Sequence, residues 1–228
     1  ALAQAGKRVL LADADLRRPN VCPMLGISLE RLTEIRKEAS ETCRREASIY
    51  YIKNLDISVM TFHTHSHRFY SLLRASSLKE LFDPLREQYD YILIDTPPSR
   101  DVMVTNALMA SDFVLIPCVC DDYSRDSVYR TVAMCQQLEH DEGEKIDVLG
   151  IILTMVEKTA LTEVIRNELR ASQLGSKLFA AEIRKGQAVK DSTRLGAPVV
   201  LCARSSNPAK DYAKVYAELK TRVEQEAE

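Results

Sequence analysis

Residues 89–112, YDYILIDTPPSRDVMVTNALMASD, contain the stretch that decides the fold. The apolar run Tyr91–Ile94 ends on one carboxylate, Asp95, which a threonine and two prolines follow. Such a run predicts a buried parallel strand, and Pro97 and Pro98 end it because proline cannot donate to a sheet ladder. Open α/β sheets bind ligands at the carboxyl ends of their strands. Asp95 is therefore a candidate to hold Mg²⁺ at a phosphate site, directly or through water, unless it only caps the next turn.

A second apolar segment, Val9–Ala12, runs directly into the acidic sequence DAD at residues 13–15. Strands that helical sequence separates typically form a parallel sheet, whose carboxyl ends lie along one edge. We therefore predict an α/β fold with a mostly parallel sheet flanked by helices on both faces. Asp13, Asp15 and Asp95 are expected to meet in one crevice of that sheet. The alternative for Asp13 and Asp15 is a pair of caps on a turn.

Composition narrows the possible classes of protein. A chain of 228 residues with 46% hydrophobic content can form one large α/β domain or two small ones. A net charge of −2 excludes a generally basic nucleic-acid binder, so any DNA contact needs a local basic patch. No apolar run reaches the length of a membrane span, and no signal peptide is visible. Cys118 and Cys120 lie in a predicted buried strand, which favours reduced thiols and a cytoplasmic protein.

Apolar periodicity predicts the remaining elements. Strands are expected at Leu55–Thr61, Phe113–Val119, Asp147–Met155 and Lys177–Ile183. Helices are expected at Ser77–Gln88, Tyr123–Glu139, Ala160–Ala171, before Gly196, and at Asn207–Glu226. In the last helix the spacing predicts an apolar core face made of Tyr212, Val215, Tyr216, Leu219 and Val223.

Two segments have less specific patterns. Ser28–Asn54 is highly charged and mainly helical in pattern, which is typical of a solvated face. His63, His65 and His67 would share one face of a strand, as a zinc site requires. Since no acid or cysteine is close by in the sequence, a surface loop is the favoured interpretation.

Seven short motifs together carry a family resemblance. They are, in chain order, VLLADAD, YILIDTPP, NAL, ASD, VLIP, ILTM and GAPV. As a set they resemble the ParA/MinD/Soj group of deviant P-loop ATPases, and ParA in particular. AGKRVLLADAD at residues 5–15 resembles the switch I strand, and IDTPPSRDVMVTNAL at residues 94–108 resembles switch II, or Walker B. The resemblance implies a single SIMIBI-like P-loop ATPase domain over residues 1–228.

One motif of that family does not occur. No G-x-x-x-x-G-K-[ST] is found in these residues, although in the family the phosphate loop and the first strand precede switch I. That loop supplies backbone amides, a lysine and a hydroxyl for the triphosphate and Mg²⁺. The chain opens in mid-helix character without a Met, so we expect it to be truncated at its start. We expect ATP hydrolysis by the intact protein, but weak or no ATP binding by these residues alone.

The resemblance also implies roles for named residues in the hydrolysis of ATP with Mg²⁺. Asp13 would hold a Mg²⁺-bound water, Asp15 would orient or activate the attacking water, and Asp95 would complete the second shell around the metal. Contacts to the nucleotide base are implied for the segments that carry Thr154, Met155, Arg184 and Lys185. Ordinary loop structure is the alternative for those segments.

ParA relatives form a homodimer on ATP, bind DNA non-specifically and act with a ParB-like partner, without a membrane anchor. The resemblance therefore implies a cytoplasmic, nucleoid-associated protein. A local excess of positive charge in the C-terminal third could contact phosphates through Lys190, Arg194, Arg204, Lys210 and Lys214. A solvated helix surface is the alternative for each of these residues.

Two rival functions come from other classes. DADLRRP at residues 13–19 also resembles P-loop bacterial tyrosine kinases, which typically carry a C-terminal tyrosine cluster. The last thirty residues hold only Tyr212 and Tyr216. The second rival is a pseudo-ATPase module that docks partners without catalysis. Autophosphorylation and nucleotide binding would distinguish these functions, while the cargo and the stimulating partner cannot be identified from the sequence.

Overall fold

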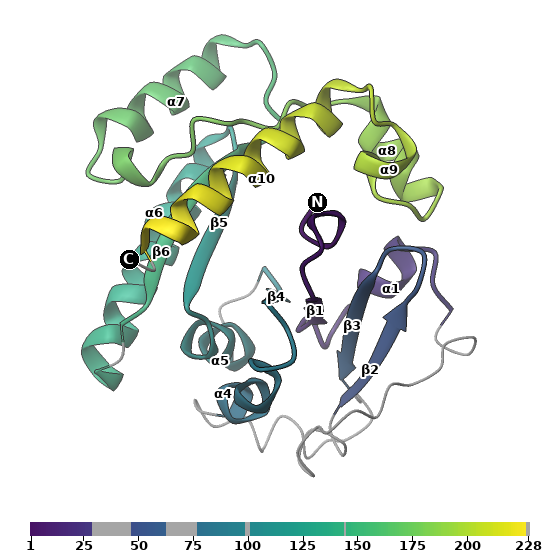
Figure 1. Cartoon of the computed structure of the whole chain (residues 1–228). Coiled ribbons are helices and arrows are strands. Elements are labelled where there is room, and N and C mark those ends of the chain that lie inside the picture. The colour runs from purple at the N-terminus through teal and green to yellow at the C-terminus, as the bar shows by residue number, and fades with distance from the viewer. Residues whose placement is uncertain (29–46, 63–76, 99–100, 144, 227–228) are drawn as a thin grey trace. The chain divides into compact units, whose positions relative to one another are not determined.

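The computed structural model describes residues 1–28, 47–62, 77–98, 101–143 and 145–226. They belong to two compact units, Ala1–Ser111 and Asp112–Glu228, each built on its own sheet (Figure 1). Among these residues, no helix combines the length and the apolar character that a bilayer span needs. The expectation of a single domain over residues 1–228 stays a prediction.

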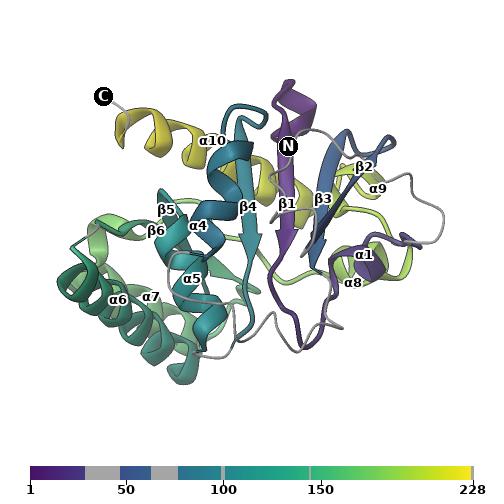
Figure 2. The same cartoon turned by 90° about the horizontal axis from the view of Figure 1, so that it is seen from below.

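The first unit contains a four-stranded sheet with the order β2-β3-β1-β4 (Figure 2). β1 (Val9–Asp13) lies between β3 (Ile57–Phe62) and β4 (Tyr91–Asp95) and runs parallel to both. β2 (Ala47–Ile52) pairs antiparallel with β3. The expected mostly parallel sheet is therefore confirmed, and the two strands with acidic ends are immediate neighbours.

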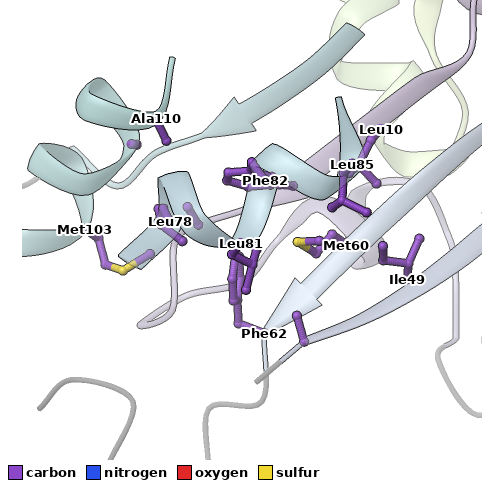
Figure 3. Packing of buried hydrophobic residues seen from close by; sticks show 14 of the residues in the cluster. Leu10, Ile49, Met60, Phe62, Leu78, Leu81, Phe82, Leu85, Met103 and Ala110 are labelled. Atoms are coloured by element: carbon purple, nitrogen blue, oxygen red, sulfur yellow. The ribbon is translucent and has the colours of Figure 1, made fainter. Parts of the chain in front are cut away.

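Helices cover both faces of this sheet. α4 (Ser77–Phe82), a 3-10 turn at Asp83–Leu85 and α5 (Val102–Ala110) lie on one face. Leu10, Met60 and Phe62 of the strands pack there against Leu78, Leu81, Phe82 and Leu85, the apolar side predicted for this helix (Figure 3). α1 (Val21–Met24) covers the other face, against Val59 and Ile52. Both faces are apolar because successive strand side chains point in opposite directions.

The second unit is built on two parallel strands, β5 (Phe113–Val119) and β6 (Asp147–Thr154). α6 (Asp122–Glu142) and α7 (Ala160–Ala171) pack on one face through Val128, Ile165 and Leu169. α10 (Asn207–Glu226) packs on the opposite face, where Val215 contacts the segment around Phe179. The remaining elements are a 3-10 turn at Gly175–Lys177, α8 (Gln187–Arg194) and α9 (Val199–Cys202).

Several local predictions were wrong. Residues 47–52 form strand β2, although Ser28–Asn54 was expected to be mainly helical. The high charge of that range masked the β-forming run ASIYYI at its end. Lys177–Ile183 is not a regular strand, since it begins in a 3-10 turn and makes only isolated bridges, Ile151↔Leu178 and, one residue beyond it, Val156↔Arg184.

Two predicted core positions are also more exposed than expected. Leu93 of β4 and Tyr212 of α10 each expose 39% of their surface. In the described part of its sheet β4 pairs only with β1, so apolar character alone overestimated the burial of this strand. The three histidines at 63, 65 and 67, and residues 29–46, lie outside the described residues.

A single arginine anchors α10 to the rest of the second unit. The guanidinium of Arg222 donates to the backbone carbonyls of Leu149 and Leu178, at 3.2 and 2.9 Å, and to the carboxylate of Glu218. It also lies 4.3 Å from the centroid of the Phe179 ring. The contacts join α10 to the start of β6 and to the chain before the 183–186 loop.

We expect Arg222→Ala to lower the free energy of unfolding by about 2 kcal/mol, because partly buried carbonyls lose their donor. Lys220→Ala removes only an exposed ion pair on the same helix and is expected to cost less than about 0.5 kcal/mol. Urea unfolding followed by circular dichroism measures both values. Equal losses in the two variants would contradict an anchoring role for Arg222.

Candidate functional site

The acidic ends of β1 and β4 lie side by side. Asp13 and Asp95 are register partners in the parallel ladder, and the Ala14 N–H donates to the Asp95 carbonyl at 2.8 Å. The pairing therefore continues one residue past β1, and Asp15 follows directly. The predicted convergence of three acids at one sheet edge is present in the first unit.

Asp13 is held by backbone amides. Its side chain belongs to a residue that is only 3% exposed, and Oδ2 accepts from the Val21 N–H at 2.9 Å. Oδ1 accepts from the Asp15 N–H at 3.3 Å. Asp13 thus fixes the path of the chain from β1 into α1, as the turn-capping alternative expected. A carboxylate oxygen has more than one lone pair, so these bonds leave room for a cation or a bound water.

Asp15 shapes the next turn. Its Oδ1 accepts from the N–H groups of Arg17 and Arg18, at 3.2 and 3.0 Å. This is the local pattern by which aspartate stabilises turns. Within the described residues, Oδ2 of Asp15 accepts no hydrogen bond. The residue is half-buried, so one oxygen is fixed by the turn and the other is available to a water molecule.

Asp95 has the perturbed carboxyl group of the three. Partial burial raises its pKa, and the charges of Asp13 and Asp15 raise it further. In the part of the chain that the structure describes, its side chain accepts no hydrogen bond. Carboxylates that crowd one another in this way are stabilised by a hard divalent cation, and their oxygens are the ligands that Mg²⁺ prefers. The residues present therefore fit Mg²⁺.

Two further residues border this cluster, and sequence reasoning did not select them. Asp101 caps α5, because its Oδ1 accepts from the N–H groups of Met103 and Val104 at 3.0 and 3.4 Å. Arg17 places its guanidinium 3.8 Å from the Asp101 carboxylate. An aspartate directly before a helical run was a usable signal for the cap. No sequence signal indicated its pairing with Arg17.

The four residues expected to contact the nucleotide base come together in the second unit. Thr154 and Met155 follow one another at the end of β6, and a parallel bridge joins Val156 to Arg184. The Lys185 N–H extends that pairing by donating to the Val156 carbonyl at 3.0 Å. Met155 is 52% exposed and has a φ of 53°, a left-handed conformation that non-glycine residues seldom adopt.

The side chains of those residues have internal partners. Arg184 forms two 2.7 Å bonds to the buried carboxylate of Asp211 on α10. Lys185 pairs with Glu157 at 3.1 Å. Arg184 thereby tethers the loop to α10, and it lowers the pKa of Asp211 by hydrogen bonding. Any contact to a base would come from the backbone and the exposed Met155 rather than from these two charges.

The five predicted DNA-contacting residues are all exposed in the second unit. Lys190 and Arg194 belong to α8, Lys210 and Lys214 belong to α10, and Arg204 lies in the connection between α9 and α10. α9 contacts both α8 and α10. Within the residues described, none of the five cations takes part in an ion pair, so their charge is available to an anionic partner.

Comparisons with known proteins place the chain among characterised relatives. The family model for the AAA domain (AAA_31) matches residues 1–148. The chromosome partitioning protein ParA of Caulobacter vibrioides is 26% identical over 234 residues, which cover 97% of this chain and 86% of the relative. Among solved structures, the Cyanothece McdA–ATP complex matches with a TM-score of 0.76 at 21% identity, covering 97% of this chain and 87% of that chain. The Pyrococcus furiosus cell division ATPase MinD matches with a TM-score of 0.72 at 18% identity, covering 98% and 88%.

We expect Asp95→Asn to raise the melting temperature at pH 7 when no divalent cation is present. The folded pKa of Asp95 is raised, so the charged carboxylate destabilises the fold as pH rises through that pKa, and Asn removes this effect. Millimolar Mg²⁺ should stabilise the unsubstituted chain and leave Asp95→Asn unchanged. Thermal unfolding with and without Mg²⁺ measures both effects.

Asp90→Asn provides a matched control at the opposite end of β4. Arg8 lowers the pKa of Asp90 to about 2 through a 2.8 Å ion pair. The charged form therefore stabilises the fold above the ordinary pKa, and that contribution disappears as pH falls through about 2. Asp90→Asn should lower the melting temperature at pH 7, and should retain the response to Mg²⁺. The same sign for both variants would argue against a repulsive carboxylate cluster.

Proposed function

The chain belongs to the AAA domain family, as a ParA/MinD-type P-loop ATPase, and on that premise we propose that it serves as a partition ATPase. The proposed reaction is Mg²⁺-dependent hydrolysis of ATP, coupled to dimerisation on ATP and to non-specific binding of DNA. The observation that carries the proposal is the register pairing of Asp13 with Asp95. It brings three carboxylates to the strand ends where this class of fold binds phosphate and metal.

In the proposed reaction a water molecule attacks the γ-phosphorus of ATP. A bond forms between the water oxygen and phosphorus, and the bond from phosphorus to the β,γ-bridging oxygen breaks, so that ADP leaves with the electron pair. Asp15 holds and orients the water with its available Oδ2, and the released proton passes to that carboxylate or to phosphate. Asp13 keeps the turn rigid so that Asp15 stays in place.

The carboxylates of Asp13 and Asp95 would hold Mg²⁺, through its bound waters. When bound, the ion neutralises phosphate charge and orients the leaving group. Phosphoryl transfer needs positioning and charge neutralisation more than covalent chemistry. Carboxylates on two adjacent strand ends supply both, and their mutual repulsion is relieved by the cation.

The proposed cellular role follows the same relatives. A ParA-like ATPase of this kind would act in the cytoplasm on the nucleoid, with a ParB-like partner that stimulates hydrolysis. The exposed cations of α8, α10 and the connection between α9 and α10 would contact DNA phosphates without reading sequence.

The proposed hydrolysis is tested in the complete gene product, with any residues that precede Ala1. Asp15→Asn is expected to lower kcat by about 100-fold, and to change the affinity for ATP by less than about threefold, because only the orientation of water is lost. Phosphate release and equilibrium binding of a labelled ATP give the two numbers. Asp141→Asn, which changes an exposed acid on α6, should leave both unchanged. Unaltered hydrolysis by Asp15→Asn, or transfer of phosphate to tyrosine, would contradict the proposed reaction.

DNA binding gives a second test. We expect binding of the complete gene product to duplex DNA to require ATP and to weaken roughly tenfold in Arg194→Glu at moderate salt. The affinity should also fall steeply as salt concentration rises. Lys145→Glu reverses an exposed charge at the start of β6 and serves as the control. Fluorescence anisotropy with two unrelated duplexes measures the affinities, and equal losses for the two variants would exclude a local DNA surface on α8.

A further inference from the structure

Arg17 lies on the turn that carries Asp15 and spans the ends of two strands. Its N–H donates to Asp15 Oδ1 at 3.2 Å, while its guanidinium reaches the Asp101 carboxylate at 3.8 Å. Asp101 begins the helix that follows β4. The side chain of Arg17 therefore extends from the segment after Asp13 to the segment after Asp95, beside the carboxylate cluster.

The pair between Arg17 and Asp101 is held loosely. The Arg17 side chain is 66% exposed and that of Asp101 is 23% exposed, and the separation is long for an ion pair. At the other ends of β1 and β4, Arg8 and Asp90 form a 2.8 Å pair, and Arg8 also donates to the Glu87 carbonyl. An exposed pair at 3.8 Å contributes little to stability, so Arg17 can leave Asp101 at low cost.

A triphosphate bound beside the cluster would be a better partner for this guanidinium. Its planar fork of donors matches two phosphate oxygens, and such charge-assisted pairs are stronger than a single long contact. In phosphoryl transfer, an arginine that reaches the transferring group stabilises the charge that develops on its equatorial oxygens. The carboxylates cannot supply this, because they are negative.

We propose that Arg17 is a further catalytic residue, whose guanidinium exchanges the Asp101 carboxylate for γ-phosphate oxygens during hydrolysis. This inference rests on the proposed function. Arg17 neither gains nor loses a proton in the step, and the bonds made and broken are those of the hydrolysis itself. Asp101 acts as a resting partner that keeps the guanidinium beside the site and competes with the phosphate.

The two partners of the pair are then expected to have opposite effects. Loss of Arg17 removes the transition-state contact, whereas loss of the Asp101 charge removes a competitor. A pair that only braces the two segments predicts the same sign for both, since either substitution breaks the brace. Asp101→Asn is suitable because asparagine caps helices as well as aspartate does, so α5 keeps its N-cap.

The experiment measures ATP hydrolysis and the affinity for Mg²⁺ with the non-hydrolysed analogue AMPPNP, in the complete gene product. Arg17→Ala should lower kcat by about 100-fold and change KM by less than about threefold, and Arg17→Lys should restore part of kcat. Asp101→Asn should raise kcat roughly twofold to fivefold and tighten AMPPNP binding. Arg8→Ala is the control for a lost Arg–Asp pair on the same strands, with kcat within about twofold of the unsubstituted protein.

The outcomes separate the two proposals. If the unsubstituted protein hydrolyses ATP and both Arg17→Ala and Asp101→Asn slow it, the pair is a brace and the role of Arg17 is overturned. An unchanged kcat in Arg17→Ala overturns that role as well. If the unsubstituted protein neither binds AMPPNP nor hydrolyses ATP, the proposed function fails, and the role of Arg17 fails with it. Melting temperatures of all variants show whether a lost activity reflects lost folding.

Discussion

The parallel pairing of β1 with β4 is the constraint on which the candidate site depends. In a parallel ladder both strands end at the same edge, so Asp13 and Asp95 must be neighbours once the apolar residues before them are in register. The apolar side chains hold that register through the core on both faces of the sheet. A slip of one residue would turn each of them to the wrong face, which is why the position of the acids is so strongly determined.

The acids do not share one role. Asp13 is buried and bound to two backbone amides, so it gives the turn its shape. Asp15 divides its oxygens between the turn and solvent, and Asp95 carries the electrostatic strain of the cluster. Rigidity, a free oxygen and an unsatisfied charge are thus distributed over three carboxylates within one sheet edge. Phosphoryl transfer needs this combination, because it relies on positioned groups and neutralised charge.

Charge in the second unit is used differently. Arg184 and Arg222 spend their donors on groups within their own unit, and both bind α10 to the chain around residues 176–184. The cations of α8 and α10 remain exposed. A reading of sequence alone treats all of these residues as equivalent positive charges. Their pairing separates those that hold the fold together from those available to a nucleic acid.

Local pattern was sufficient for most elements and for the three acids. The apolar runs before Asp13 and Asp95 are each followed by residues that end a strand, and the helices at Ala160–Ala171 and Asn207–Glu226 were predicted with their correct bounds. β2 was missed because charge dominated its window, and the exposure of Leu93 was missed because burial depends on what lies beside a strand. Neither property is encoded within a few residues.

The sequence by itself determined that this chain is a parallel α/β protein with acidic strand ends of the ParA/MinD type, because apolar periodicity and strand-ending residues act locally. Only the tertiary structure decided which oxygens of Asp13 and Asp15 are occupied, that Arg17 meets Asp101, and that Arg184 is bound to Asp211. Those pairings join segments that are distant in the chain. They depend on distances that the register of the sheet and the packing of the helices set, and no local pattern of residues specifies such distances.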